Sequence, residues 1–283
     1  MSHPLTWLDV FTSTPLRGNG LAVVHAADAV SDETMLAFAR ETQLSETTFV
    51  QSARDAGADY ANRIWTTGGE IPFAGHPSLG TAVAVAHLDG RRTASYVQET
   101  HAGLQPVEVE LDGHQARASM LQGPAGMGAE AERATVAAAA GLGVGQLHPE
   151  LPPQVVTTGQ PHLMVPVRDA AVLDAVRPAF ARFKPLMSLA GAMVLYLAAV
   201  EPGGRVSARG FFVGDGAVRE DPATGSAAGP LCAYLHIRTG ADRITIDQGA
   251  AMGRPSRLHC AMEGDRIRVG GDVVVVGTGT LLV

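Results

Sequence analysis

The chain has 283 residues, of which 46% are hydrophobic and 17% charged, and its formal net charge is −7 at pH 7. This length allows one large domain or two domains of about 100 to 150 residues. The acidic balance gives no basic surface for a phosphate backbone, so nucleic acid is not expected as a partner. Only Lys184 is a lysine, and only Cys232 and Cys260 are cysteines, which leaves little material for Schiff-base, disulfide or zinc-finger chemistry.

The N-terminal segment and the apolar stretches give no sign of a membrane or of secretion. Residues 1–9 lack the basic start and the apolar run of a secretory signal. The longest apolar stretch, Ala190 to Val200, has the length of a core helix or strand and is too short to cross a bilayer. We therefore expect a soluble, cytoplasmic protein without a membrane partner.

The first half of the chain is dominated by strand patterns. Strands are expected over 7–10, 21–25, 47–50 and 60–66, and antiparallel strands between 95 and 120. Ser31 is expected to cap a helix whose first turn carries acidic residues. A glycine-rich loop over 67–75 ends at His76-Pro77, which opens an apolar helix over 78–88 because proline suits a first helical turn.

The second half begins with a change of composition to glycine, alanine and acidic residues, with one alanine-rich helix expected over 130–140. Strands are then expected over 154–158, 162–167, 193–200 and 206–213. The segment from Glu220 to Ser226 comes next, then a helix to about Ile237, before strands over 244–248, 256–262, 266–270 and 272–276. We expect an N-terminal domain over 1–122, completed by about 270–283, a C-terminal domain over 123–269, and an active-site cleft between them.

The two halves show an internal similarity. A shift of 145 positions places His76-Pro77 on Asp221-Pro222, and Gly80-Thr81-Ala82 on Gly225-Ser226-Ala227. In each half a glycine-rich loop precedes an x-Pro step and an alanine-rich helix. Chance matching is the alternative in a sequence so rich in alanine and glycine, but an offset of half the chain favours two similarly folded domains.

The starts of the two matched helices are the expected chemical centre. A helix N-terminus presents free backbone N–H groups and a positive dipole end, which suits a substrate carboxylate or the charge of an enolate. No phosphate-binding or metal-ligand spacing accompanies them, so neither a cofactor nor a metal is expected. Each polar side chain there also has a purely structural alternative, as a helix cap, a first-turn residue or a surface carboxylate. The polar residues concerned are His76, Ser78, Asp221, Thr224 and Ser226 at the helix starts, and Glu46 between a helix and a strand.

Two longer stretches, Gly68 to Gly80 and Glu220 to Ala227, resemble the two signatures of the PhzF-like phenazine biosynthesis family. Shorter agreements include Leu44-Ser45-Glu46-Thr47 and the segment from Gln248 to Ser256. The sequence departs from the family at Gly20, where a proline is usual, and in the approach to the second signature. The resemblance implies an α+β, diaminopimelate-epimerase-like fold of two pseudo-symmetric domains, each a strongly curved, mostly antiparallel sheet or barrel around a central helix, usually as a homodimer.

The resemblance also implies a cofactor-independent isomerase that moves a proton between carbons of a small carboxylate-bearing substrate. Glu46 resembles the acid/base of the family, and His76, Asp221 and Ser226 resemble its partners in substrate binding and proton handling. Gly75 and Gly225 would line the helix starts, where we also expect Ser78 and Thr224 to contact substrate. Burial would bring the pKa of such a carboxyl group near the working pH.

Two other functions remain open from the sequence. The same helix ends could hold a small carboxylate without catalysis, as a binding protein would. An amino-acid epimerase of the same fold would need two opposed thiols at the helix starts. Cys232 is expected inside the second helix and Cys260 in a late strand, so neither thiol is placed for that role.

Overall fold

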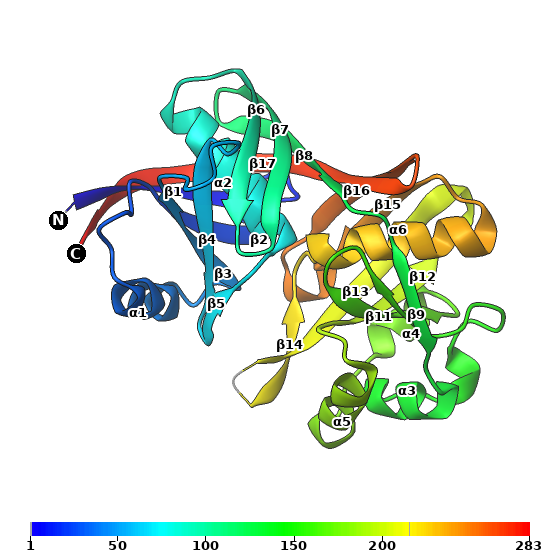
Figure 1. Cartoon of the computed structure of the whole chain (residues 1–283). Coiled ribbons are helices and arrows are strands. Elements are labelled where there is room, and N and C mark those ends of the chain that lie inside the picture. The colour runs from blue at the N-terminus through cyan, green and yellow to red at the C-terminus, as the bar shows by residue number, and fades with distance from the viewer. Residues whose placement is uncertain (1, 215) are drawn as a thin grey trace. The chain divides into compact units, whose positions relative to one another are not determined.

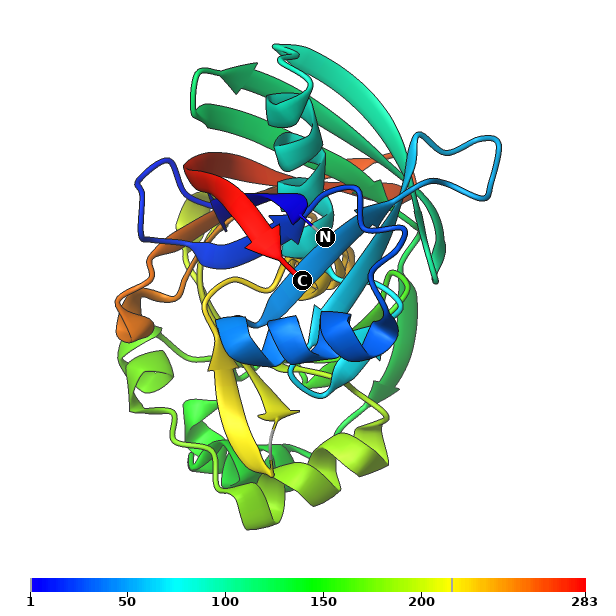
Figure 2. The same cartoon turned by 90° about the vertical axis from the view of Figure 1, so that its left-hand side faces the viewer.

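A computed structural model describes residues 2–214 and 216–283. The chain divides into two compact units, Met1–Leu121 with Gly270–Val283, and Gln122–Val269. Each unit consists of strands gathered around one long helix (Figures 1 and 2). No helix in the described part of the chain is both long and apolar enough to cross a membrane.

The first unit contains nine strands and two helices in the described residues. They are β1 (Ser2–Val10), β2 (Asn19–Val24), α1 (Asp32–Thr42), β3 (Glu46–Gln51), β4 (Tyr60–Thr66), β5 (Gly69–Ile71), α2 (Gly75–Leu88), β6 (Thr93–Thr100), β7 (Gly103–Asp112), β8 (Gln115–Gln122) and β17 (Arg266–Leu282). As predicted, the Ser31 side chain caps α1 by accepting a hydrogen bond from the Thr34 backbone.

Eight of these strands close into a barrel around α2. The order is β17, β1, β2, β3, β4, β6, β7, β8, and β8 pairs with β17 to complete the ring, while β5 extends β4 as a hairpin. Helix α2 is buried on nearly every side, which explains why its sequence is apolar all round instead of amphipathic. A Cβ on Gly80 would lie 2.5 Å from Leu21 Cδ2, so glycine allows the close approach of helix and strand.

The strands of the second unit gather around helix α6 (Gly225–Thr239). Its other elements are β9 (Gly126–Glu130), α3 (Arg133–Ala140), β10 (Gln154–Thr157), β11 (Pro161–Val167), α4 (Ala170–Ala175), α5 (Phe180–Ala190), β12 (Leu195–Val200), β13 (Arg205–Gly214), β14 (Ala217–Asp221), β15 (Arg243–Gln248) and β16 (Ser256–Glu263). Three short 3-10 turns cover 144–146, 202–204 and 250–252.

The strand pairings repeat between the units. β2 and β3 are parallel and joined through α1, while β11 and β12 are parallel and joined through α4 and α5. β4 and β6 are parallel with hairpin partner β5, and β13 and β15 are parallel with hairpin partner β14. These matched pairings confirm the predicted α+β fold of two pseudo-symmetric units, each a curved sheet around a central helix.

Several predicted element boundaries were wrong. The alanine-rich helix begins at Arg133, because 126–130 form strand β9 and Glu132 caps the helix through the Ala134 and Thr135 backbone. Helices α4 and α5 were not predicted, although a parallel strand pair requires a long crossover between β11 and β12. The two strands expected over 266–276 are one continuous strand, β17.

Candidate active site

The first unit brings Glu46, His76 and Asn19 together. Glu46 opens β3 beside Leu21 of the parallel strand β2, and His76 lies in the first turn of α2. His76 Nε2 lies 3.5 Å from Glu46 Oε2, and Asn19 Nδ2 lies 3.1 Å from His76 Nδ1. The imidazole is 3% exposed, whereas the Glu46 side chain keeps 17% of its surface. The Glu46 side chain is therefore accessible to a ligand, while the buried His76 ring packs against it.

His76 is neutral at physiological pH. Burial lowers the pKa of its imidazole to about 3, and a hydrogen bond with the Gly20 backbone acts in the opposite direction. Asn19 Nδ2 lies at Nδ1 of the ring, and Nε2 faces Glu46 Oε2. The pair is therefore a neutral imidazole beside a carboxyl group and not an ion pair.

The other predicted residues of this unit belong to the same helix turn. Gly75 is the first residue of α2, which agrees with its expected place at the helix start. Ser78 is fully buried and its hydroxyl donates to the Ala74 carbonyl at 2.9 Å. This bond turns the Ser78 hydroxyl toward the helix backbone.

The second unit gathers Asp221, Thr224, Gln248 and Tyr196. The Thr224 hydroxyl donates to Asp221 Oδ2 at 2.7 Å. Gln248 Nε2 donates to the Asp221 carbonyl at 2.8 Å and to Thr224 Oγ1 at 3.0 Å, while its Oε1 accepts from the buried Tyr196 hydroxyl at 2.8 Å. These bonds fix the segment that leads from β14 into α6. Gln248 and Tyr196 were missed as site residues, because only the fold brings them to this segment.

The predicted place of Asp221 was wrong. Asp221 is the last residue of β14, and Thr224 occupies the N-cap of α6, which begins at Gly225. Helix α2 begins at Gly75 and helix α6 at Gly225, so α6 begins five residues later than the offset of 145 predicts. With the helix starts matched, Ser226 is the counterpart of His76. The structure leaves Ser226 half-buried in the first turn of α6, whose Gly225 carbonyl accepts from Gln122 Nε2 at 3.0 Å.

The hairpin before each central helix explains this misalignment. In the first unit, Arg63 donates to both carboxylate oxygens of Glu70, at 2.7 and 2.6 Å, and its guanidinium lies 5.4 Å from the Trp65 ring centre. In the second, Arg209 binds Glu220 in the same way, at 2.8 and 2.7 Å, and lies 4.9 Å from the Phe211 ring centre. In both hairpins the glutamate pairs directly opposite the aromatic residue. The arginines differ by 146 positions and the glutamates by 150, so the second hairpin is four residues longer.

We predict that the two arginines differ in their contribution to stability. Arg209 is the more buried, with 11% of its side chain exposed against 18% for Arg63, and it also donates to the Leu173 and Val176 carbonyls at 3.0 and 3.2 Å. Arg209→Met leaves a carboxylate and two carbonyls without these donors, so we expect a loss of about 3 kcal/mol in urea unfolding. Arg63→Met, the matched control, should lower the free energy of unfolding by about half as much, because the Arg63 side chain is more exposed to solvent. Equal losses would contradict this ranking.

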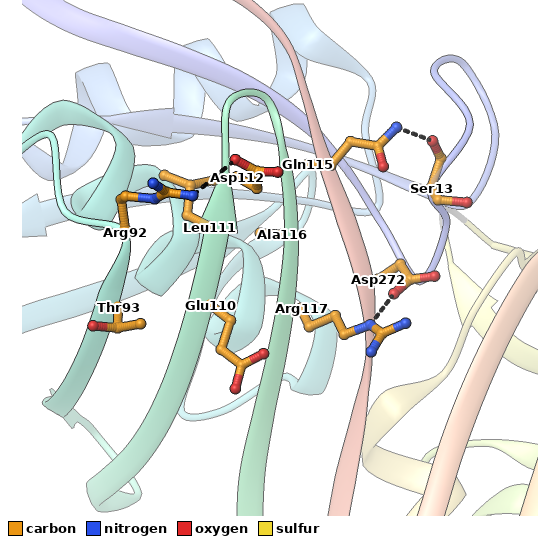
Figure 3. A pocket seen from close by; sticks show the side chains of 10 residues that line it. All are labelled: Ser13, Arg92, Thr93, Glu110, Leu111, Asp112, Gln115, Ala116, Arg117 and Asp272. Carbon is orange, nitrogen blue, oxygen red and sulfur yellow. Dashed lines mark hydrogen bonds and ion pairs between the residues drawn. The ribbon is translucent and has the colours of Figure 1, made fainter.

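One hollow on each unit lies away from these residues. A cavity of about 600 Å³ in the first unit lies over β7 and β8, where Arg92 pairs with Asp112 and Arg117 with Asp272 (Figure 3). These two exposed ion pairs are typical of a solvated surface. Within the described residues, no three His, Cys, Asp or Glu side chains gather as a metal site would require.

The comparisons with known proteins agree with the fold. Residues 8–280 match the family model described as phenazine biosynthesis-like protein. The chain belongs to this family. It is 36% identical over 294 residues to a trans-2,3-dihydro-3-hydroxyanthranilate isomerase of Pseudomonas chlororaphis, covering 99% of each chain. The enzyme of the same name from Pseudomonas aeruginosa is 38% identical over 288 residues, covering 98% of this chain and 96% of that one.

Solved structures of the PhzF family share the whole architecture. A predicted epimerase from Pseudomonas aeruginosa is 35% identical, with a TM-score of 0.88 and 99% of both chains covered. A PhzF-family protein from Bacillus anthracis is 25% identical, with a TM-score of 0.86 and full coverage of both chains. A hydroxyproline epimerase from Agrobacterium vitis, at 13% identity and a TM-score of 0.68 with 99% of this chain and 91% of that chain covered, shares the fold. The full-length relatives named isomerases place this chain in the isomerase class of enzymes.

Proposed function

We propose that the protein moves a proton between carbons of a small carboxylate-bearing substrate without a cofactor, with Glu46 as the acid/base. The observation that carries this proposal is the placement of a partly exposed carboxylate against a buried, neutral imidazole that is itself held by Asn19. A carboxylate that must both accept and return a proton needs one face open to substrate and one face fixed by the protein.

The chemistry follows from the charges at this site. The Glu46 carboxylate takes a proton from a substrate carbon, and the electrons that remain spread into the conjugated system of the substrate. The protonated Glu46 then returns the proton to a second carbon. His76 stays neutral throughout, and in the tautomer with the proton on Nε2 the ring would stabilise the carboxylate form, so no second charge develops in the buried turn.

The second unit would contribute to substrate binding. Asp221 and Thr224 form a linked pair next to the start of α6, and Ser226 offers a hydroxyl in its first turn. The backbone N–H groups at Gly75 and Gly225, each at the start of a long helix, suit a carboxylate or a developing enolate. We take trans-2,3-dihydro-3-hydroxyanthranilate, named by the relatives, as the first substrate to test.

We predict that the purified protein converts this substrate in D₂O and that deuterium appears at the product carbon that receives the proton. The carboxyl proton of Glu46 exchanges with solvent while the substrate is bound, so part of the label enters the product. NMR and mass spectrometry of the product measure this. Binding without conversion or exchange, seen by calorimetry, would instead support a carboxylate-binding protein.

The two-thiol epimerase is not favoured by the chemistry of the cysteines. Cys232 is buried inside α6 and Cys260 in β16. Burial raises the pKa of the Cys232 thiol to about 12 and that of Cys260 well above its ordinary value. Both are protonated at physiological pH and enclosed by the core, so neither can act as a base on a substrate.

A further inference from the structure

His162 is a buried histidine that the proposed chemistry does not use. It lies in β11 and is 1% exposed. Neither ring nitrogen reaches full hydrogen-bond geometry with any residue that the structure describes. A buried imidazole without partners is costly, because its polar atoms lose the hydrogen bonds of water, so such a group calls for an explanation.

The strand alternation places His162 against the central helix. Leu163, Val165 and Val167 of β11 pack into the core cluster formed with residues of α3, α4 and α5. Successive side chains of a strand point to opposite faces, so His162 faces the other side of the sheet, which α6 covers. Within α6 the ring approaches the Ser226 backbone: burial lowers the pKa of His162 to about 4, and the Ser226 backbone acts in the opposite direction.

The Ser226 carbonyl needs a donor that α6 cannot supply. In an α-helix the carbonyl of residue i accepts from the N–H of residue i+4. For Ser226 that residue is Pro230, which lies inside α6 and has no N–H. The proline ring also pushes the carbonyl four residues earlier away from the helix axis. The backbone group that raises the pKa of His162 must accept a hydrogen bond, which identifies it as this carbonyl.

We propose that the imidazole of His162 donates to the Ser226 carbonyl in place of the N–H that Pro230 lacks, and so positions the first turn of α6. A small rotation of the ring completes this bond. Gln122 Nε2 likewise donates a hydrogen bond to the preceding carbonyl, that of Gly225, at 3.0 Å. His162 is a positioning residue in this assignment, and its effect on catalysis rests on the proposed role of Ser226.

A mutant cycle with Pro230 tests the assignment without substrate. His162→Leu removes the donor, and Pro230→Ala restores the backbone N–H. We expect His162→Leu to lower the thermal unfolding midpoint in the wild-type background by at least twice as much as in the Pro230→Ala background. His25→Leu is the matched control, since His25 is also buried, with a pKa of about 4, but bonds to Thr6 Oγ1 at 2.9 Å. Its loss should be equal in both backgrounds, and an equal loss for His162→Leu would overturn the proposal.

The imidazole signals give a second readout should His162→Leu fail to fold. In protein labelled with ¹⁵N-histidine, the signals assigned by His162→Gln should show one neutral tautomer from pH 5.5 to 8, with a ring N–H protected from exchange with water. In Pro230→Ala that N–H should lose protection, because the Ser226 carbonyl has gained a backbone donor. Mixed tautomers, or protection that Pro230→Ala leaves unchanged, would overturn the assignment.

Turnover separates the inference from the proposed function. His162→Leu should lower kcat for trans-2,3-dihydro-3-hydroxyanthranilate about tenfold, the size of one lost hydrogen bond, and His162→Leu with Pro230→Ala should recover most of it. If the wild-type protein does not act on this compound, the proposed function fails while the stability cycle still decides the role of His162. If turnover in the double variant is not restored, the first turn of α6 is not positioned by this bond.

Discussion

Replacing Glu46 by glutamine should lower the rate of solvent-deuterium incorporation by about 10²- to 10⁴-fold while substrate binding changes little. Glutamine keeps the size and the hydrogen-bonding oxygen of the side chain but cannot accept and return a proton. His76 Nε2, 3.5 Å from Glu46 Oε2, would still have a carbonyl oxygen to face. Single-turnover exchange followed by NMR, with calorimetry for binding, measures the two effects separately.

Glu41→Gln is the matched control for this substitution. Glu41 is an exposed glutamate near the end of α1 in the same unit, so its loss should leave exchange and binding at wild-type levels. Wild-type exchange in Glu46→Gln would remove Glu46 from the mechanism. An activity lost together with binding would indicate a binding role for this carboxylate instead.

A second large effect is expected from pH. Burial lowers the pKa of His25 to about 4, of His76 to about 3 and of His162 to about 4. Below pH 6.5 the unfolded chain binds protons at these histidines and the folded chain does not, so stability falls as the pH falls. Each histidine costs about 1.4 kcal/mol per pH unit between its unfolded and folded pKa values, or about 4 kcal/mol per unit for the three.

Urea unfolding at pH 8, 7, 6.5, 5.5 and 5 measures this loss. We expect little change between pH 8 and 7 and a steep fall below 6.5, enough to remove most of the stability of a typical domain near pH 5. His25→Gln removes one of the three groups, so the slope should fall by roughly a third. A stability that does not change between pH 6.5 and 5 would contradict the neutral state of these histidines.

The fold was largely predictable because its two signatures lie at the starts of the central helices. An apolar helix without a polar face, such as α2, is typical of an element enclosed by strands. Helices α4 and α5 were missed because prolines interrupt their sequence, including Pro185 inside α5, and because α4 is only six residues long. The need for a crossover between parallel strands becomes visible only when the pairing is known.

Individual residues of the site could be predicted from the sequence, but their contacts with one another could not. His76 was found from its place at a helix start and Glu46 through the family resemblance, and the structure brings them within 3.5 Å of each other. Asp221 was placed at a helix start because the offset assumed hairpins of equal length, whereas the second is four residues longer. The partners Asn19 and Gln248 contact the site through strand pairing, which a single sequence without an alignment does not show.

The long strand β17 sets the order in which the two units can fold during synthesis. Residues 270–283 belong to the first unit, where β17 pairs with β1 from Ser2 to Val10 and with β8. The barrel that carries Glu46 and His76 therefore stays open until residues 270–283 have left the ribosome. The second unit, complete at Val269, can close first and shield its own core while the earlier segment waits for its final strand.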